Sequence, residues 1–367
     1  MFANTPLASL KRGAFFSQAK KVLTLILIGA FVSCQNNRAT VSTYAGNGKP
    51  GAANGKITDA SFYNLMGLAV DSGGSVFVAD SRNNLIRKIS ADGMVSTLAG
   101  NGAAGKTDGP AAKASFTYPM AVAVDSKGNV YVCDTQNNLI RKISTDGTVS
   151  TIAGALTDAN KNHPEDTTRL DNPKGIVADK QGNVYFTDFG RDVIRKITPD
   201  GKITVFAGDS DRGAKDGKGT AASFYLPTGL AIDDQGNLFV ADTYNNTIRK
   251  IDPGGMVTTI AGKPAPQGKR NGGAKDGKGP AAQFRHPFGI AVDHNDNVYV
   301  ADVGNQKIRK ISPDGVVTTI AGAGRRAGDN GEASKASFYN PYGVAVDKQG
   351  NVYIADYQNN VVRKLSF

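Results

Sequence analysis

The 367-residue chain contains no tryptophan, only two cysteines and almost no glutamate. Glutamate occurs at Glu165 and Glu332 alone, so nearly all of the 32 acidic residues are aspartate. Because aspartate favours turns and caps whereas glutamate favours helix interiors, this bias argues against a mainly helical protein. The chain also lacks the HExxH, GxSxG and P-loop motifs of common hydrolases and nucleotide-binding enzymes.

The chain is rich in glycine, with 44 residues, and its 40% share of hydrophobic residues is ample for a core. Its formal net charge of +11 is a moderate positive balance. Such a balance favours anionic partners in general but does not name one.

Residues 1–33 have the pattern of an export signal. Basic residues lie ahead of an apolar run at 22–32, and no acidic residue precedes Cys34. The run is shorter than the ~20 residues that span a bilayer, so residues 1–33 are predicted to be a cleaved secretory signal.

The end of this run, Phe31-Val32-Ser33-Cys34, resembles a bacterial lipoprotein signal, in which cleavage precedes a cysteine that then carries lipid. The family's usual leucine is replaced by Phe31, and the alternative is an ordinary signal with an incidental cysteine. The resemblance implies lipidation of Cys34, with residues 34–39 as a short linker. Cys133 would then have no partner, so stability would come from packing without a disulfide.

From residue 40 onward the sequence repeats. Copies of a GLAVD-like motif begin at Gly67, Ala121, Gly175, Gly229, Gly289 and Gly343, at spacings of 54 or 60 residues. Each copy holds up to four short β-rich runs, A to D, such as GLAID, NLFVAD, TIRKI and MVTTIA, separated by turn signals rich in Asp and Gly. Four antiparallel strands in a repeat of this size predict one blade of a β-propeller.

The two ends of the chain predict that the blades close into a ring. The sixth copy stops at Phe367 after strand C, and its missing strand D matches residues 40–46. The N-terminal strand would complete the last blade and remove exposed sheet edges. The predicted fold is therefore all-β, a six-bladed propeller over residues 40–367.

The motif VAD-x-x-N-x-x-I, as in residues 78–86, resembles the NHL repeat, and the resemblance covers residues 40–367 six times over. The family's asparagine falls on Asn83, Asn137, Asn245, Asn305 and Asn359, and its histidine is replaced by Asn84, Asn138, Asn246, Gln306 and Asn360. Blade three departs at both positions, with Arg191 and Asp192. The resemblance implies a propeller of NHL type.

The long D–A connections are here termed inserts. Because successive strands alternate in direction, the inserts and the B–C loops lie on the same face of the ring, which is termed the insert face. Long inserts on one face of a repeat array usually form its binding surface. Five inserts end in Ala-x-Phe, and each phenylalanine is predicted to plug into its own blade: Phe62, Phe116, Phe224, Phe284 and Phe338.

Every blade also repeats an aspartate at the end of strand B and an arginine in strand C. The aspartates are Asp80, Asp134, Asp188, Asp242, Asp302 and Asp356, and the arginines are Arg87, Arg141, Arg195, Arg249, Arg309 and Arg363. A ring of carboxylates suggests metal or acid–base chemistry. A residue that every blade needs is better explained by cap hydrogen bonds and by charge pairing between neighbouring blades. A catalytic site needs asymmetry, so function is sought where the repeat breaks.

The repeat breaks at a limited set of positions on the insert face. The candidate binding residues are His163, Glu165, Arg191, Asp192, Tyr244, His286 and Tyr357, with the basic residues Arg270, Arg285, Arg325 and Arg326. A basic patch beside exposed tyrosines could hold an anionic polymer, and the alternative is a solvated loop. His294 lies in an A–B turn and is expected on the opposite face.

The sequence therefore predicts a non-catalytic binding scaffold, exported and lipid-anchored to the bacterial cell envelope on its periplasmic or surface side. Its partner would be an envelope protein, a glycan or an anionic polymer, and a monomer is expected. No cofactor is predicted, although a divalent metal on the insert face stays open. The alternative is a metal-dependent enzyme, because the chain resembles propeller lyases and lactonases that need His, Glu, Asp or Asn ligands near the central channel. Nucleic-acid binding is disfavoured because an exported protein rarely meets RNA.

Overall fold

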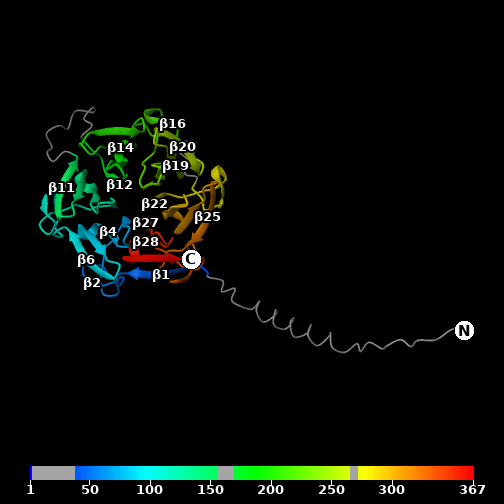
Figure 1. The fold of residues 1–367 in the computed structure, drawn as a ribbon, viewed down its shortest axis with the longest axis horizontal. Helices are drawn as coiled ribbons and strands as arrows, with labels where there is room; N and C mark the ends of the chain where they lie inside the picture. The colour runs from blue at the N-terminus through cyan, green and yellow to red at the C-terminus, as the bar shows by residue number, and fades with distance from the viewer. Residues whose placement is uncertain (2–37, 155–168, 265–271) are drawn as a thin grey trace. The chain divides into compact units, whose positions relative to one another are not determined.

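The computed structural model describes Met1 and residues 38–154, 169–264 and 272–367. The predicted functional residues Cys34, His163, Glu165 and Arg270 lie outside these ranges. The chain from Ala39 to Phe367 is one compact unit, which Figure 1 shows as a ring of sheets around a central axis.

The ring consists of six sheets, each of which is one blade with strand A innermost and strand D toward the rim. In the order A to D, blade one has β3 (Leu68–Val70), β4 (Val76–Asp80), β5 (Leu85–Ile89) and β6 (Met94–Ala99), and blade two has β8 (Ala121–Val124), β9 (Val130–Asp134), β10 (Leu139–Ile143) and β11 (Thr148–Ala153). Blade three has β12 (Pro173–Ala178), β13 (Val184–Asp188), β14 (Val193–Ile197) and β15 (Ile203–Ala207), and blade four has β17 (Leu230–Ile232), β18 (Leu238–Asp242), β19 (Thr247–Ile251) and β20 (Met256–Ala261). Blade five has β22 (Pro287–Val292), β23 (Val298–Asp302), β24 (Lys307–Ile311) and β25 (Val316–Ala321), and blade six has β27 (Pro341–Val346), β28 (Val352–Asp356), β29 (Val361–Ser366) and β1 (Thr40–Ala45).

The hydrophobic core lies between the blades. Strand B is buried along its whole length in every blade, because the neighbouring blades cover both of its faces. Each core cluster joins two adjacent blades, as where Phe239 of blade four packs with Ile290 and Val300 of blade five. The β-branched and aromatic residues of these runs suit such a pleated, two-sided surface.

The N-terminal strand closes the ring, as predicted. β1 pairs antiparallel with β29, with Thr40 opposite Ser366 and Val41 opposite Leu365, and Figure 1 shows β1 beside the C-terminal strand. Strand D runs toward the insert face, so Thr40 lies at the opposite face. That face carries the A–B and C–D turns and is termed the turn face.

Contrary to the prediction from the sequence, the inserts do not stay on the insert face. Each of five inserts runs along the outer edge of the next blade and adds a short fifth strand to strand D: β2 (Gly55–Lys56), β7 (Gly109–Pro110), β16 (Gly217–Lys218), β21 (Gly277–Lys278) and β26 (Gly331–Glu332). Lys278 pairs with Val316, the first residue of strand D, so the insert reaches the turn-face end of the rim. The inserts return through the five plug phenylalanines, which are fully buried as predicted.

Glycine at the start of strand A lets neighbouring inner strands touch backbone to backbone. A Cβ atom on Gly229 would lie 2.1 Å from the carbonyl oxygen of Phe288 in the next blade. The same clash, at 2.1–2.6 Å, would arise at Gly67, Gly175, Gly289 and Gly343. Tight packing around the axis therefore explains why glycine recurs in the GLAVD-like motif.

Candidate functional site

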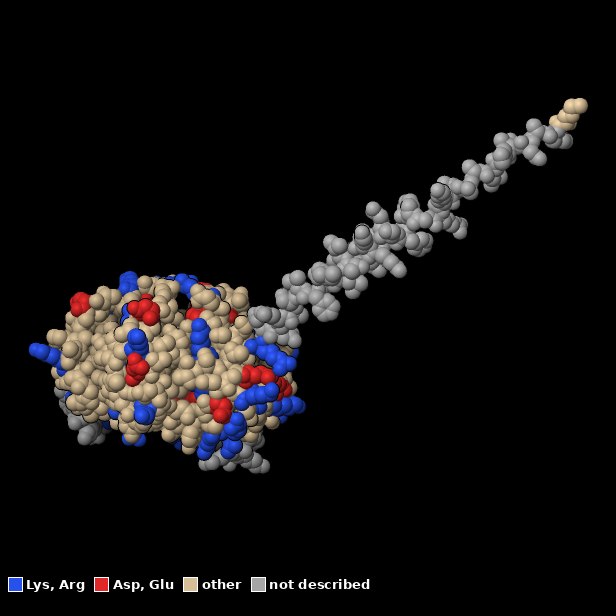
Figure 2. Space-filling view, turned by 90° about the horizontal axis from the view of Figure 1, so that it is seen from below, with Lys and Arg blue, Asp and Glu red and all other residues tan. Residues whose placement is uncertain are grey.

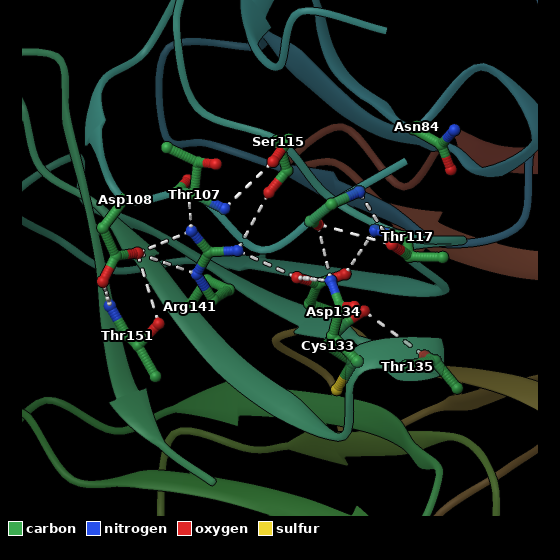
Figure 3. A network of polar contacts seen from close by, with 12 residues as sticks. Asn84, Thr107, Asp108, Ser115, Thr117, Cys133, Asp134, Thr135, Arg141 and Thr151 are labelled. Atoms are coloured by element: carbon green, nitrogen blue, oxygen red, sulfur yellow. Dashed lines mark hydrogen bonds and ion pairs between the residues drawn. The ribbon is translucent and has the colours of Figure 1, made fainter. Parts of the chain in front are cut away.

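The repeated charges attach each insert to its blade. In blade two, shown in Figure 3, Arg141 Nη1 donates to Asp134 Oδ2 at 2.9 Å and to the Ser115 carbonyl at 3.0 Å. Its Nη2 donates to the Thr107 carbonyl at 2.9 Å and to Asp108 Oδ1 at 2.5 Å. Because Ser115, Thr107 and Asp108 all belong to the insert, this buried guanidinium is a structural clamp.

The same ion pair occurs in all six blades, and each pair lies within one blade. Nitrogen–oxygen distances are 2.7–2.9 Å for the pairs Asp80–Arg87, Asp134–Arg141, Asp188–Arg195, Asp242–Arg249, Asp302–Arg309 and Asp356–Arg363. The expectation of charge pairing between neighbouring blades is therefore wrong. The expectation of cap hydrogen bonds is wrong as well. Each aspartate precedes a short 3-10 helix without capping it, and its Oδ1 instead accepts a backbone N–H from the end of its insert.

These aspartates are fully buried. Burial raises the pKa of Asp242 to about 6, although Arg249 and hydrogen bonds from Asn245 and the Tyr225 backbone act in the opposite direction. Each carboxylate is already engaged with its arginine and with the insert, so the ring of aspartates is structural.

Neighbouring blades are linked by the last residue of each B–C loop. This residue has a φ of 54–57°, and its side-chain oxygen accepts a backbone N–H of the next insert at 2.5–2.9 Å. The six links are Asn84–Tyr118, Asn138–Asn172, Asp192–Leu226, Asn246–His286, Gln306–Asn340 and Asn360–Asn64. Asp192, a predicted binding residue, therefore has the same structural role in blade three as asparagine elsewhere.

The asymmetric part of the propeller lies on the ring axis. A cavity of about 220 Å³ is lined by strand A of all six blades, and most of its wall is Gly, Ala, Val, Leu and Ile. The exceptions are residues that immediately precede the first residue of the GLAVD-like motif, at the insert-face end of the cavity. These five residues are termed the channel mouth: Met66, Met120, Lys174, Phe288 and Tyr342.

Among the residues that the structure describes, Lys174 is the only charged side chain that lines this cavity. Its Nζ atom lies 3.1 Å from the ring centroid of Phe189 and 5.9 Å from that of Phe288, both of which are cation–π contacts. Burial away from water lowers the pKa of Lys174 to about 8. Within the described ranges no carboxylate forms an ion pair with this ammonium group.

Aromatic side chains continue from Lys174 around the mouth. The rings of Phe288 and Tyr342 meet edge to face with centroids 4.7 Å apart, and those of Tyr342 and Tyr357 do so at 5.0 Å. The hydroxyls of Tyr357 and Tyr118 lie 3.0 Å apart and share a hydrogen bond. These contacts form one continuous aromatic row, in which Phe288 and Tyr342 line the cavity while Tyr357 and Tyr118 lie beyond its lining.

Sequence reasoning identified Tyr357 but missed Lys174, Phe189, Phe288 and Tyr342. The available signal was variation within the repeat, because the residue before the GLAVD-like motif is Met66, Met120, Lys174, Thr228, Phe288 or Tyr342. The residue after the strand-B aspartate is Ser, Thr or Val in four blades but aromatic in the two that contain Phe189 and Tyr357. Both positions break the repeat at the insert-face end of the axis.

Two other predicted aromatic residues lie outside the channel mouth. Tyr244, which is 46% exposed, stacks on His286 with centroids 5.4 Å apart. Tyr225 adds a tilted contact with Tyr244 at 5.3 Å. Neither Tyr244 nor His286 lines the central cavity.

The predicted basic residues do not share one environment. Arg325 pairs with Asp329 at 2.7 Å, and the guanidinium of Arg326 lies 5.8 Å from the ring centroid of Tyr339. Arg285 is exposed beside the B–C loop of blade five, where its carbonyl accepts the N–H of Gly304. Figure 2 shows Lys and Arg interspersed with Asp and Glu over the visible side of the propeller.

Arg191 and His294 occupy two further environments. Arg191 is half-buried, and its Nε atom lies 3.9 Å from Asp188 Oδ2. His294 Nδ1 lies 2.8 Å from Asp234 Oδ2 on the turn face, as the sequence predicted for that residue.

Nowhere in the described ranges do three His, Cys, Asp or Glu side chains converge as a metal ion requires. The same ranges contain no helix of sufficient length and hydrophobicity to cross a bilayer.

Comparison with family models identifies the repeat. The NHL repeat model matches residues 62–89, 116–143, 284–311 and 338–365, and the teneurin NHL domain model matches residues 205–271. Each NHL match begins at a plug phenylalanine and ends in strand C. The matched unit therefore contains the Asp–Arg clamp and the B–C loop.

Curated relatives match most of this chain. The chain is 29% identical to NHL repeat-containing protein 2 of Bos taurus, over 78% of this chain and 44% of that protein. It is also 29% identical to SUPPRESSOR OF QUENCHING 1, chloroplastic, of Arabidopsis thaliana, over 81% of this chain and 30% of that protein. The chain thus spans less than half the length of these relatives.

Solved structures share the fold at low sequence identity. An auxiliary nutrient binding protein from Bacteroides thetaiotaomicron has a TM-score of 0.68 at 16% identity, over 90% of this chain and 76% of that chain. Virginiamycin B lyase from Staphylococcus aureus has a TM-score of 0.54 at 18% identity, over 90% of this chain and 99% of that chain. Together with the family matches and the observed sheets, these comparisons identify the chain as an all-β, six-bladed β-propeller of NHL type, built from NHL repeats.

Proposed function

We propose that this protein is a non-catalytic binding propeller that holds a small ligand at its channel mouth. One observation carries the proposal: at the channel mouth, side chains from five blades depart from the repeat and line a single cavity. A concave, mainly apolar pocket with a few polar groups is the usual form of a small-molecule site.

The size of the cavity supports a small ligand. Its volume of about 220 Å³ is below the ~300–1,000 Å³ that is typical of sites for drug-sized molecules. The partly exposed rings of Phe288 and Tyr342 line the cavity and offer apolar contact, and the Tyr342 hydroxyl offers a hydrogen bond. Similarity to proteins described as auxiliary nutrient binding proteins agrees with such a role.

The proposal includes an exported protein anchored to the bacterial cell envelope through a lipid on Cys34. Thr40, where the first strand of the propeller begins, lies at the turn face, opposite the channel mouth.

Retention of small molecules by the full chain tests the proposal. The detergent-solubilised protein is equilibrated with a small-molecule extract of the envelope, washed, and denatured to release ligands for mass spectrometry. Wild type is compared with a Phe288→Ala/Tyr342→Ala variant and with Tyr63→Ala, which removes an aromatic side chain outside the mouth.

We expect wild type and Tyr63→Ala to retain the same ligand and the double variant to retain at least ~10-fold less, since an aromatic contact contributes ~0.5–1.5 kcal/mol beyond its buried area. Equal retention by wild type and the double variant would overturn the proposal. Retention of no ligand by wild type would overturn it as well.

A further inference from the structure

Resting on the proposed function, we infer that the ligand is a sugar-like ring bearing a carboxylate, and that Lys174 recognises the carboxylate. The channel mouth combines one cation, the aromatic rings of Phe288 and Tyr342, and the Tyr342 hydroxyl. Each of these three features matches one part of an acidic monosaccharide, or of the terminal unit of an acidic glycan. The hydroxyls of Tyr118 and Tyr357 lie beyond the cavity lining, where Tyr357 contacts Tyr342.

The cation has no fixed counter-charge in the described structure. On its neighbouring elements, Asp188 pairs with Arg195, and Asp171 accepts a hydrogen bond from Asn172. Arg191, on the same loop as Phe189, is also positive and offers no neutralisation. A half-buried ammonium group held only by an aromatic face can gain a charge-assisted hydrogen bond when a ligand brings a carboxylate.

The remaining groups favour a sugar ring over an aromatic acid. A pyranose has apolar C–H faces that can lie against Phe288 and Tyr342, and hydroxyls around its edge. The hydrogen bond between Tyr118 and Tyr357 uses only one of their two hydroxyl protons, so one proton can be donated elsewhere. The inner edges of the six A strands add backbone groups that no neighbouring strand pairs. An aromatic carboxylate would leave these hydrogen-bonding groups unused.

The test is a matched pair of sugars that differ at one group. D-glucuronate and D-glucose are titrated calorimetrically into the detergent-solubilised full chain at pH 7. We expect glucuronate to bind about 10-fold more tightly, because a hydrogen bond to a charged group contributes ~1.5–3 kcal/mol net. The preference should decline between pH 7 and pH 9, as Lys174, with a pKa of about 8, loses its proton.

Two methionine variants separate recognition by Lys174 from a general effect of charge. Lys174→Met should bind both sugars with the affinity that wild type has for glucose. Lys196→Met removes a lysine of the same blade whose Nζ atom lies 5.3 Å from the Tyr185 ring centroid, away from the cavity lining. This control should keep the full preference for glucuronate.

The outcomes distinguish this inference from the proposed function. If both sugars bind equally, or if Lys174→Met keeps the preference, the inference is overturned while binding at the mouth stands. If neither sugar binds, the inference is overturned too, and the retention experiment decides the proposed function by itself.

Discussion

The position of a lysine relative to the ring axis decides its chemical character. Lys174 and Lys196 both lie over an aromatic ring in blade three. Only Lys174 lines the axial cavity, where burial lowers its pKa to about 8. Sites that bind ligands often retain groups that weaken the fold, so the stability of the folded state can report on this residue.

We predict that Lys174→Met raises the free energy of unfolding by about 1–3 kcal/mol at pH 7, since it replaces a poorly solvated cation with an apolar chain of similar length. The folded-state pKa of Lys174, about 8, lies below the ordinary value of 10.5. Between these values the unfolded chain binds more protons, so the stability of wild type rises with pH. The advantage of the variant should therefore shrink from pH 8 to pH 10.5.

Urea unfolding at pH 7 and pH 10.5 measures this effect, with Lys196→Met as the control for loss of a lysine charge in the same blade. A Lys174→Met protein that is less stable than wild type at pH 7 would contradict the expected desolvation of Lys174. An advantage of equal size at both pH values would contradict it as well.

At the scale of strands and loops, the ring depends on contacts that only a few residues allow. Glycine at the start of strand A permits backbone contact between neighbouring blades, and the last residue of the B–C loop links those blades at the insert face. Both contacts recur around the axis. Each can be removed with a single substitution that leaves the strands themselves intact.

Gly229→Ala should lower the free energy of unfolding by about 2–3 kcal/mol, because the new Cβ atom would lie 2.1 Å from the Phe288 carbonyl oxygen. The backbone of Gly229 is not left-handed, so the cost is steric. Ala121→Gly is the matched reverse change at the equivalent position of blade two, and it should cost less than about 1 kcal/mol. Chemical denaturation of the two variants gives the comparison, and equal costs would count against tight axial packing.

Asn246→Gly should destabilise the protein by about 1–2 kcal/mol, since it leaves the backbone N–H of His286 without its acceptor. Glycine accepts the φ of 56° at this position, so the loss isolates the hydrogen bond. Asn246→Asp keeps an acceptor, as Asp192 does in blade three, and should melt close to wild type. If both variants melt alike, the link between blades does not contribute to stability.

Strand positions and plug phenylalanines could be predicted because the sequence repeats them six or five times. Closure could be predicted because the strand that the sixth copy lacks is found at residues 40–46. The path of the inserts could not, because pairing of Lys278 with Val316 depends on a strand two residues long with no hydrophobic pattern. The channel mouth was missed for a different reason. Lys174, Phe288 and Tyr342 are distant in sequence, and only the ring geometry brings one residue per blade to the same axis.

At the scale of the whole molecule, one strand joins the two ends of the chain. Deleting residues 40–46 should open the ring, because it removes the strand that pairs with β29 and the buried side chains Val41 and Ala45. We expect a broad thermal transition in place of a cooperative one, together with aggregation through the exposed edge of β29. Calorimetry of the full chain and of the deleted chain makes the comparison, and identical transitions would show that closure is dispensable.

Hydrogen–deuterium exchange of the full chain, with and without its retained ligand, locates the binding site on the propeller. We expect the ligand to slow exchange at the insert-face starts of the inner strands, in residues 66–68, 174–176, 288–290 and 342–344, and to leave the rim inserts unchanged. Protection confined to rim segments such as 212–218 and 275–279, with none at the axis, would contradict a ligand site at the channel mouth.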